Sequence, residues 1–214
     1  MRLLVLLLPV VSTFAQETKH LALTNAIKDS LRKEIAAMCV SDQKYRWQIM
    51  LGETDSVKLA GLKNMDENAK WQRVRDVTDN KIGISKSQKD SLWILQNFID
   101  SINFMKLSGV IKNYGFPKKY CETYKITAIL QHNSYRSDEG FLGLLKGEVK
   151  NGNMPGMEYA ALYDRIQNYH KQPELYYVNK RYDYERKTPA TGTPIDLEAT
   201  NKARKEIGLK RWKE

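Results

Sequence analysis

Apolar residues recur every three or four positions through most of the chain, the spacing of one face of an α-helix. The pattern predicts a helix over 21–50, a more polar helical segment over 55–77 and a long helix over 87–114. Four further helices are predicted at 120–132, 137–150, 156–169 and 196–207. The predicted fold class is therefore mainly α, a multi-helix bundle in which 16–214 forms a single domain.

Several residues have the character of helix ends. Ser87, with Asp90 three residues later, resembles a capping box at the start of the long helix. Gly115 and Pro117 follow its last residues in the order typical of a helix stop. Ser137 is the expected N-cap of the helix that follows it. The apolar positions that support the long helix are Leu92, Leu95, Ile99 and Ile102.

One stretch departs from helical spacing. The segment 175–186 is rich in tyrosine and contains a valine, a composition typical of strands. Asn179 and Lys180 lie near its middle and suit a tight turn. The sequence therefore predicts a small β-hairpin near residues 175–186.

The N-terminus has the form of a secretion signal. Arg2 is followed by an apolar run over 3–11, and small residues stand at Thr13 and Ala15. A membrane span needs about 20 apolar residues, roughly twice the length of this run. We predict that residues 1–15 are a signal peptide and that the product is secreted to a bacterial periplasm or outside the cell.

The chain is basic, with a formal net charge of +10. Removing residues 1–15 takes away only Arg2, so the mature chain carries +10 − 1, or about +9. This charge favours an anionic small molecule or a cell-wall or polysaccharide fragment as partner, with another protein as the alternative. The aromatic residues do not alternate with basic ones in any nucleic-acid-binding signature, which argues against nucleic acid.

No cofactor or metal is expected. The three histidines, His20, His132 and His170, are dispersed, and no HExxH or CxxC spacing occurs. Glycine-rich phosphate loops, dinucleotide fingerprints and nucleophile elbows are also lacking. Cys39 and Cys121 could pair in an oxidising compartment or remain buried thiols, and the sequence leaves both alternatives open.

Two charged residues lie on an apolar helix face. A turn of about 100° per residue places Asp42 and Arg46 near the centre of the stripe that contains Ile35 and Met38. Being four residues apart, they can pair with each other or reach across to another helix. They form either a structural ion pair at a helix crossing or part of a functional pocket.

His132 follows an apolar group at the end of its predicted helix. Histidine acts as an acid, base or ligand near neutral pH, but a lone histidine at a helix end is more often structural. Asp164 and Arg165 lie beside the apolar face of a later helix, and the same two interpretations apply to them.

These segments resemble an uncharacterised, often secreted bacterial family, a domain of unknown function. Its motifs are Asp-Gln-x-x-Arg, Asp-x-x-Asn before Gly-Trp-Pro, Gln-His-Ala-Asp, Asp-Arg, Tyr-Gly-Thr-Gln, and a closing helix with Arg and Gly-Leu. The matching residues are Asp42-Gln43 with Arg46, Asp100 and Asn103 before Gly115-Phe116-Pro117, Gln131-His132-Asn133-Ser134, Asp164-Arg165, and Arg204 with Gly208-Leu209. Two motifs are degenerate, because Ser134 replaces the acid and Tyr176-Tyr177-Val178-Asn179 lacks the glycine and the glutamine. The resemblance implies that Asp42, Arg46, His132, Asp164 and Arg165 converge on one site.

Two functions are compatible with these residues. The favoured hypothesis is a periplasmic or surface binding or interaction protein with a polar cleft around His132. The alternative is a hydrolase-like enzyme that uses His132 as general base. The candidate binding residues are Asp42, Arg46, Asn103, Gln131, His132, Asp164 and Arg165.

Overall fold

The computed structural model describes residues 21–120, 122–183 and 188–213. The predicted signal peptide lies outside these residues, as does Cys121 with its predicted pairing. The described chain is mainly helical, as the sequence predicts. Its elements are α1 (Asn25–Asp42), α2 (Arg46–Leu51), α3 (Ser56–Lys63), α4 (Glu67–Thr78), α5 (Lys86–Tyr114), α6 (Thr123–His132), a 3₁₀ turn η1 (Ser134–Arg136), α7 (Glu139–Lys150), α8 (Gly156–Tyr169), β1 (Lys180–Asp183), β2 (Thr188–Thr191) and α9 (Leu197–Glu206).

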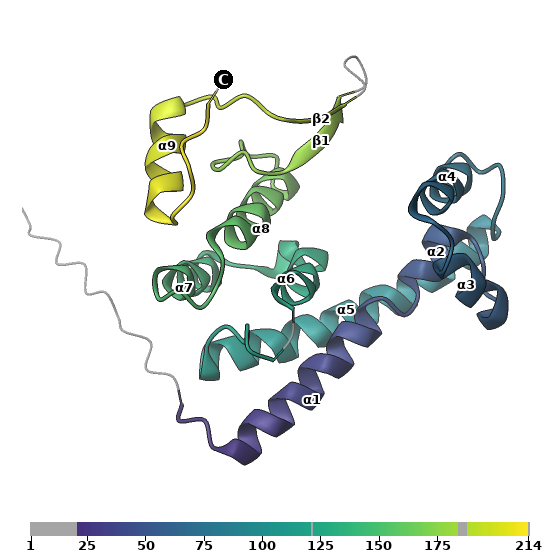
Figure 1. Ribbon diagram of the computed structural model, residues 1–214, viewed down its shortest axis with the longest axis horizontal. Coiled ribbons are helices and arrows are strands. Elements are labelled where there is room, and N and C mark those ends of the chain that lie inside the picture. Colours follow the sequence, from purple (N-terminus) through teal and green to yellow (C-terminus); the bar gives the residue numbers. More distant parts are fainter. Residues whose placement is uncertain (1–20, 121, 184–187, 214) are drawn as a thin grey trace, which may run out of the picture.

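The long helices α1 and α5 lie side by side and run in opposite directions (Figure 1). The short helices α2, α3 and α4 gather at one end of this pair, whereas α6 packs against its middle and leads on to α7, α8 and α9. The main core lies between α1, α5, α6, α7 and α8 and includes the fully buried Ile35, Leu107, Ile126, Leu145 and Leu162. Within the described residues no helix is long and apolar enough to cross a membrane.

The predicted helix over 21–50 is interrupted, because α1 ends at Asp42 and α2 begins at Arg46. The side-chain amide of Gln96 on α5 bridges the interruption. It donates to the carbonyl of Asp42 over 2.9 Å and accepts from the backbone N–H of Tyr45 over 2.9 Å. A buried side chain from another helix thus satisfies backbone groups at the break, which spacing along 21–50 alone does not reveal.

Other predicted boundaries also change. The segment 55–77 forms two helices, because Asp66 caps a new start at α4. The capping box of α5 consists of Ser85 and Gln88, not Ser87 and Asp90. The helix after η1 is capped by the carboxylate of Asp138. In each case a suitable cap stands within a few residues of the one predicted, and short-range spacing does not choose between them.

The hairpin predicted within 175–186 is wrong in position. Lys180 does not turn the chain but begins β1, which pairs antiparallel with β2, so that Lys180 lies opposite Thr191. The preceding segment 175–178 is held by hydrogen bonds to Asp164 on α8 and forms no strand. Of the tyrosines in this stretch, Tyr176 packs against Tyr159 and Tyr163 of α8, whereas Tyr182 lies in the paired strand β1.

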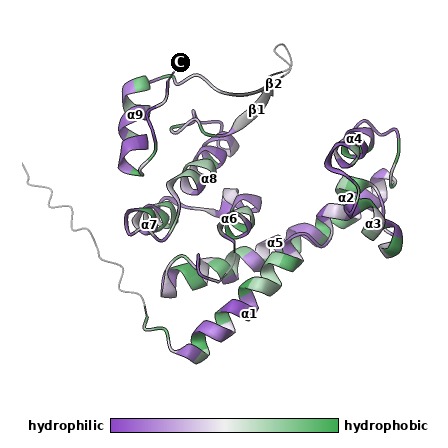
Figure 2. Cartoon of the chain, in the orientation of Figure 1, coloured by the Kyte–Doolittle hydropathy of each residue, from purple (hydrophilic) through white to green (hydrophobic). Residues whose placement is uncertain are grey.

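The face of α5 that turns inward is polar in its first half and apolar in its second. Gln96, Asp100 and Asn103 are buried, and the same face continues through the buried Leu107 and Ile111. By contrast, much of the apolar pattern in the first half of α5 faces solvent, since Leu95 is exposed and Leu92, Ile99 and Ile102 are only partly buried. Figure 2 shows hydrophobic and hydrophilic residues alternating along α1 and α5.

Candidate functional site

A buried carboxylate lies at the end of α1. Asp42 is the last residue of that helix, and its oxygen Oδ1 lies 2.8 Å from Nδ1 of His132. The other oxygen, Oδ2, accepts a hydrogen bond of 2.7 Å from the side-chain amide of Gln43. Both carboxylate oxygens are therefore engaged, and the imidazole of His132 is held in one orientation.

His132 is the last residue of α6, and its side chain is 20% exposed whereas that of Asp42 is 4% exposed. When Nδ1 donates its hydrogen to the carboxylate, the lone pair for accepting a proton lies on Nε2. A carboxylate in this position also stabilises the imidazolium that forms when Nε2 takes a proton. The geometry is that of an oriented histidine base with limited access to solvent.

Arg46, the first residue of α2, pairs with Asp100 on α5 and not with the carboxylate of Asp42. Its Nε donates to the backbone carbonyl of Asp42 over 3.1 Å. Its guanidinium carbon lies 5.7 Å from the ring centroid of Trp93, in range of a cation–π contact. Of the two alternatives that the sequence leaves open for Arg46, the structure shows the contact across to another helix, an ion pair that joins α2 to α5.

Asp100 is a second buried carboxylate beside the first. Its Oδ1 accepts a hydrogen bond of 2.7 Å from the side-chain amide of Gln96, and its Oδ2 accepts one from the guanidinium of Arg46. Burial raises the pKa of Asp100 above its usual range, and the negative charge of Asp42 raises it further, against the opposing effects of Gln96 and Arg46. We call Asp42, Arg46, Gln96, Asp100 and His132 the His132 cluster; it joins α1, α2, α5 and α6.

The predicted residues Asn103 and Gln131 lie beside this cluster. Asn103 is buried, and its amide donates to the carbonyl of Met38 and to the hydroxyl of Ser41 over 3.3 and 3.1 Å. It therefore fastens the last turn of α1, which carries Asp42, to α5. Gln131 is half-buried next to His132 in sequence, and the hydrogen bonds that join the His132 cluster do not involve it.

The His132 cluster contains three groups of the kind that bind metals. In the described part of the chain, ligand atoms of Asp42, Asp100 and His132 all lie within 4.8 Å of one another. In this arrangement Nδ1 of His132 is bonded to Asp42, and Asp100 is neutralised by Arg46. A cation would have to compete with a guanidinium for the same carboxylate, so we assign no metal to the site.

Asp164 and Arg165 are not among the residues that form the His132 cluster. Asp164 is fully buried, and its carboxylate accepts three backbone N–H groups of the segment 175–178: Leu175 at 3.0 Å, Tyr176 at 2.9 Å and Val178 at 3.2 Å. Burial raises the pKa of Asp164, against the lowering effect of these hydrogen bonds. Arg165 is exposed. In addition, Arg204 on α9 donates to the carbonyl of Tyr176.

We call Asp164, the segment 175–178 and Arg204 the Asp164 cluster. The positions that match the motifs of the resemblance therefore divide between two places. Asp42, Arg46, Asp100 and His132 meet in the His132 cluster, whereas Asp164 and Arg204 tie the 175–178 segment to α8 and α9. The hydrogen bonds of Asp164 join it to the 175–178 segment and not to the His132 cluster, so a single site that includes Asp164 and Arg165 stays a prediction.

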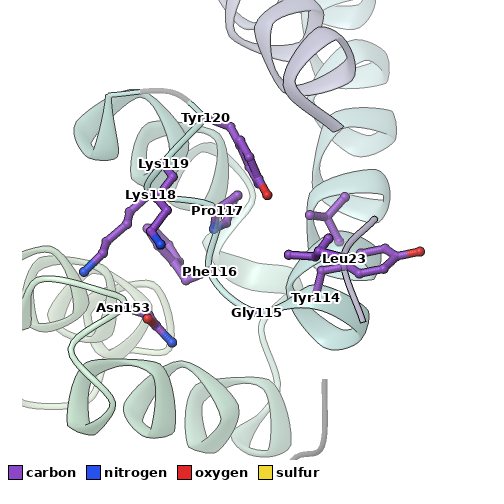
Figure 3. A pocket seen from close by; sticks show the side chains of 10 residues that line it. Leu23, Tyr114, Gly115, Phe116, Pro117, Lys118, Lys119, Tyr120 and Asn153 are labelled. Carbon is purple, nitrogen blue, oxygen red and sulfur yellow. The ribbon is translucent and has the colours of Figure 1, made fainter. Parts of the chain in front are cut away.

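The motif at Gly115-Phe116-Pro117 borders a pocket of about 150 Å³ (Figure 3). Tyr114 and Leu23 lie on one side of it, with Tyr120 and Pro117 on the other. The buried Glu148 accepts the backbone N–H of Phe116 over 2.8 Å and so fixes the turn. At the rise of a helix, this pocket is roughly 20 Å along α5 from Asp100, too far to share chemistry with the His132 cluster.

Sequence reasoning did not list Gln96 or Asp100 among the candidate site residues. The available signal was their spacing, since Gln96, Asp100 and Asn103 repeat at positions i, i+4 and i+7 of one helix face. That face continues into Leu107 and Ile111, so the polar stripe extends the core stripe. Near this stripe, the exposed Arg136 of η1 donates from its guanidinium to the hydroxyl of Ser101 on α5 over 3.0 Å.

The described residues thus define a mainly helical protein with a carboxylate–histidine pair at the meeting point of its two longest helices and α6. Comparison of the chain with protein-family models, curated proteins and solved structures finds no match.

Proposed function

We propose that this chain is an exported hydrolase-like enzyme in which His132 acts as the general base. The observation that carries the proposal is the 2.8 Å contact between Nδ1 of His132 and Oδ1 of the buried Asp42. This contact orients the ring and leaves the lone pair of Nε2 for accepting a proton, on a side chain that is 20% exposed.

In this mechanism Nε2 of His132 removes a proton from a water molecule as the water oxygen bonds to an electrophilic centre of the substrate. The bond to the leaving group then breaks, and Nε2 returns the proton to that group. Asp42 is a positioning residue that stabilises the intermediate imidazolium. Arg46 keeps Asp100 neutralised, so that the charge of Asp42 acts mainly on His132.

Four further observations support the proposal. The positions Asp42, Arg46 and His132, which stand out in the sequence as polar residues in apolar surroundings, lie in one cluster. The same positions match motifs of the often secreted family that the chain resembles. The N-terminal sequence has the form of a secretion signal, consistent with a substrate outside the cytoplasm. The net charge of +10 favours an anionic substrate, and the exposed Arg136 is a suitable group to attract one.

The test is hydrolysis of a panel of chromogenic esters, amides, phosphoesters and glycosides by the wild type and by His132→Gln. The expected result is turnover of at least one class, reduced about 10²- to 10⁴-fold by the substitution, because that is the usual contribution of a general base. Asp42→Asn should reduce the rate by a smaller factor and leave KM nearly unchanged, because it disturbs the base without touching the substrate.

The matched control is His170→Gln, since His170 is an exposed histidine at the end of another helix. It should leave the rate unchanged. Added chelator should have no effect either, because the proposed water activation uses no metal. Equal rates for wild type and His132→Gln, or no turnover of any class, would overturn the proposal, provided that melting curves show both proteins folded.

A binding or interaction protein remains the second candidate. The observation that favours it is separate from the His132 cluster: the exposed apolar residues of α5, among them Ile94, Leu95, Phe98 and Met105.

A further inference from the structure

The exposed apolar side chains of α5 follow a heptad. Counting from Ser91, steps of four and three residues lead through Leu95, Phe98, Ile102 and Met105 to Gly109. Such alternating steps place side chains along one seam of a helix, as in coiled coils. Asp100 and Leu107, which face the protein core, occupy the opposite side of the same helix. The seam therefore points away from the core.

The structure leaves this seam open to solvent. Phe98 is 67% exposed and Met105 is 60% exposed, and beside the seam Ile94 is 71% exposed. With Leu95 they present roughly 500 Å² of surface, at the upper end of the largest apolar patches found on monomers. A groove of about 420 Å³ between α1 and α5, floored by Ile99, Ile102 and Ala37, continues the apolar surface. A standard interface buries about 800 Å² from each partner, so residues that flank the seam would have to supply the remainder.

Two lysines beside the seam are paired within the chain. The Nζ atom of Lys106 lies 3.4 Å from a carboxylate oxygen of Glu34 across the groove, and that of Lys86 lies 2.7 Å from a carboxylate oxygen of Asp90 at the start of α5. The seam positions from Ser91 to Gly109 carry no charged residue, so an apolar surface of the same kind would fit them.

The order of side chains along the seam fits an antiparallel copy of itself. About a midpoint at residue 100, Ser91 would face the partner's Gly109, Leu95 the partner's Met105, and Phe98 the partner's Ile102. Small residues therefore meet at both ends, and large apolar residues meet in the middle. A two-fold symmetric interface requires this self-complementarity, which a surface that binds an unrelated protein does not need.

We propose that two copies of this chain associate through antiparallel pairing of their α5 helices, with the seam from Ser91 to Gly109 at the centre of the interface. The proposal does not depend on the function of His132, because the seam and the His132 cluster occupy opposite sides of α5.

Sedimentation equilibrium of the full chain tests this interface. The expected result is a dimer for the wild type and a folded monomer for Phe98→Glu, because residue 98 is 67% exposed in the single chain and its substitution leaves the core intact. The matched control is Val57→Glu, which alters a 79% exposed apolar residue on α3 and should remain dimeric. Higher salt should strengthen the dimer, since it screens the repulsion between two copies with a charge of +10 each. A wild-type monomer at the highest soluble concentration, or a Phe98→Glu dimer, would overturn the proposal.

A cross-linking experiment provides a second readout that does not depend on a charged substitution. In a background of Cys39→Ala and Cys121→Ala, the variant Leu95→Cys with Met105→Cys should form disulfide-linked dimers on mild oxidation, whereas Leu95→Cys alone should not. Cross-linking by Leu95→Cys alone would indicate parallel pairing of the two α5 helices. If neither variant forms a cross-linked dimer, the two helices do not pair in the proposed antiparallel arrangement.

Discussion

Two buried carboxylates, Asp42 and Asp164, have similar burial and very different partners. Asp164 binds three backbone N–H groups of one segment, none of which can change its protonation state near neutral pH. Asp42 binds the imidazole of His132 and lies beside the Asp100 and Arg46 pair. Backbone partners make a carboxylate a structural support, whereas side chains that titrate make it part of a site where protons can move.

The difference also concerns what each carboxylate connects. Asp164 fixes a segment that begins only six residues after the end of α8, so its contacts are largely local. Asp42 and its neighbours join four helices, of which α5 and α6 are distant in sequence from α1, with His132 ninety positions from Asp42. A site of this kind depends on the whole fold, and each substitution within it tests both function and assembly.

The largest effect is expected from Asp164→Ala. This change removes the acceptor of three buried N–H groups, and each unsatisfied group costs about 1–3 kcal/mol, so the free energy of unfolding should fall by at least about 3 kcal/mol. Urea denaturation measures this fall in the free energy of unfolding. Arg165→Ala, at the neighbouring exposed position, is the control and should change stability by less than about 0.5 kcal/mol. Equal effects for the two variants would mean that Asp164 does not support the 175–178 segment.

Patterns within single helices predicted the mainly helical fold, the end of α5 at Gly115 and the starts of α8 and α9. They did not predict the break after Asp42, because the group that stabilises it, Gln96, is more than fifty residues away. For the same reason they did not reveal that Arg46 pairs with Asp100. The local sequence predicts a histidine at the end of an apolar helix face, but the carboxylate partner of His132 is determined by the packing of α6 on α1.

The ion pair between Arg46 and Asp100 should contribute less to the free energy of unfolding than the hydrogen bonds of Asp164. Arg46→Met leaves Asp100 without its counter-charge, but Gln96 still donates to it and its raised pKa eases protonation, so we expect a loss of about 2 kcal/mol. Asp100→Asn should cost a similar amount because the guanidinium is then unpaired.

Combining Arg46→Met with Asp100→Asn removes both charges and should recover part of the loss. A double-mutant cycle from urea denaturation would show a coupling energy of about 1 kcal/mol or more. If the two losses simply add, the two side chains do not interact in solution, and the His132 cluster resembles the Asp164 cluster more closely than the structure indicates.

The smallest effect concerns pH. Because the pKa of Asp100 in the folded chain is raised above 3.8, the folded chain binds more protons than the unfolded chain between pH 3.8 and the raised value. Asp100 therefore contributes stability that falls as pH rises through this window, and the stability of the wild type relative to Asp100→Asn should decline over the same range. Asp42→Asn removes a charge that raises the pKa of Asp100, so it should narrow the window. The corresponding decline for Asp164, measured against Asp164→Asn, should not respond to Asp42→Asn, because backbone groups surround that carboxylate. Urea denaturation at a series of pH values measures the declines in stability that are due to Asp100 and to Asp164. If Asp42→Asn changes both declines equally, the two carboxylates do not differ in their coupling to Asp42.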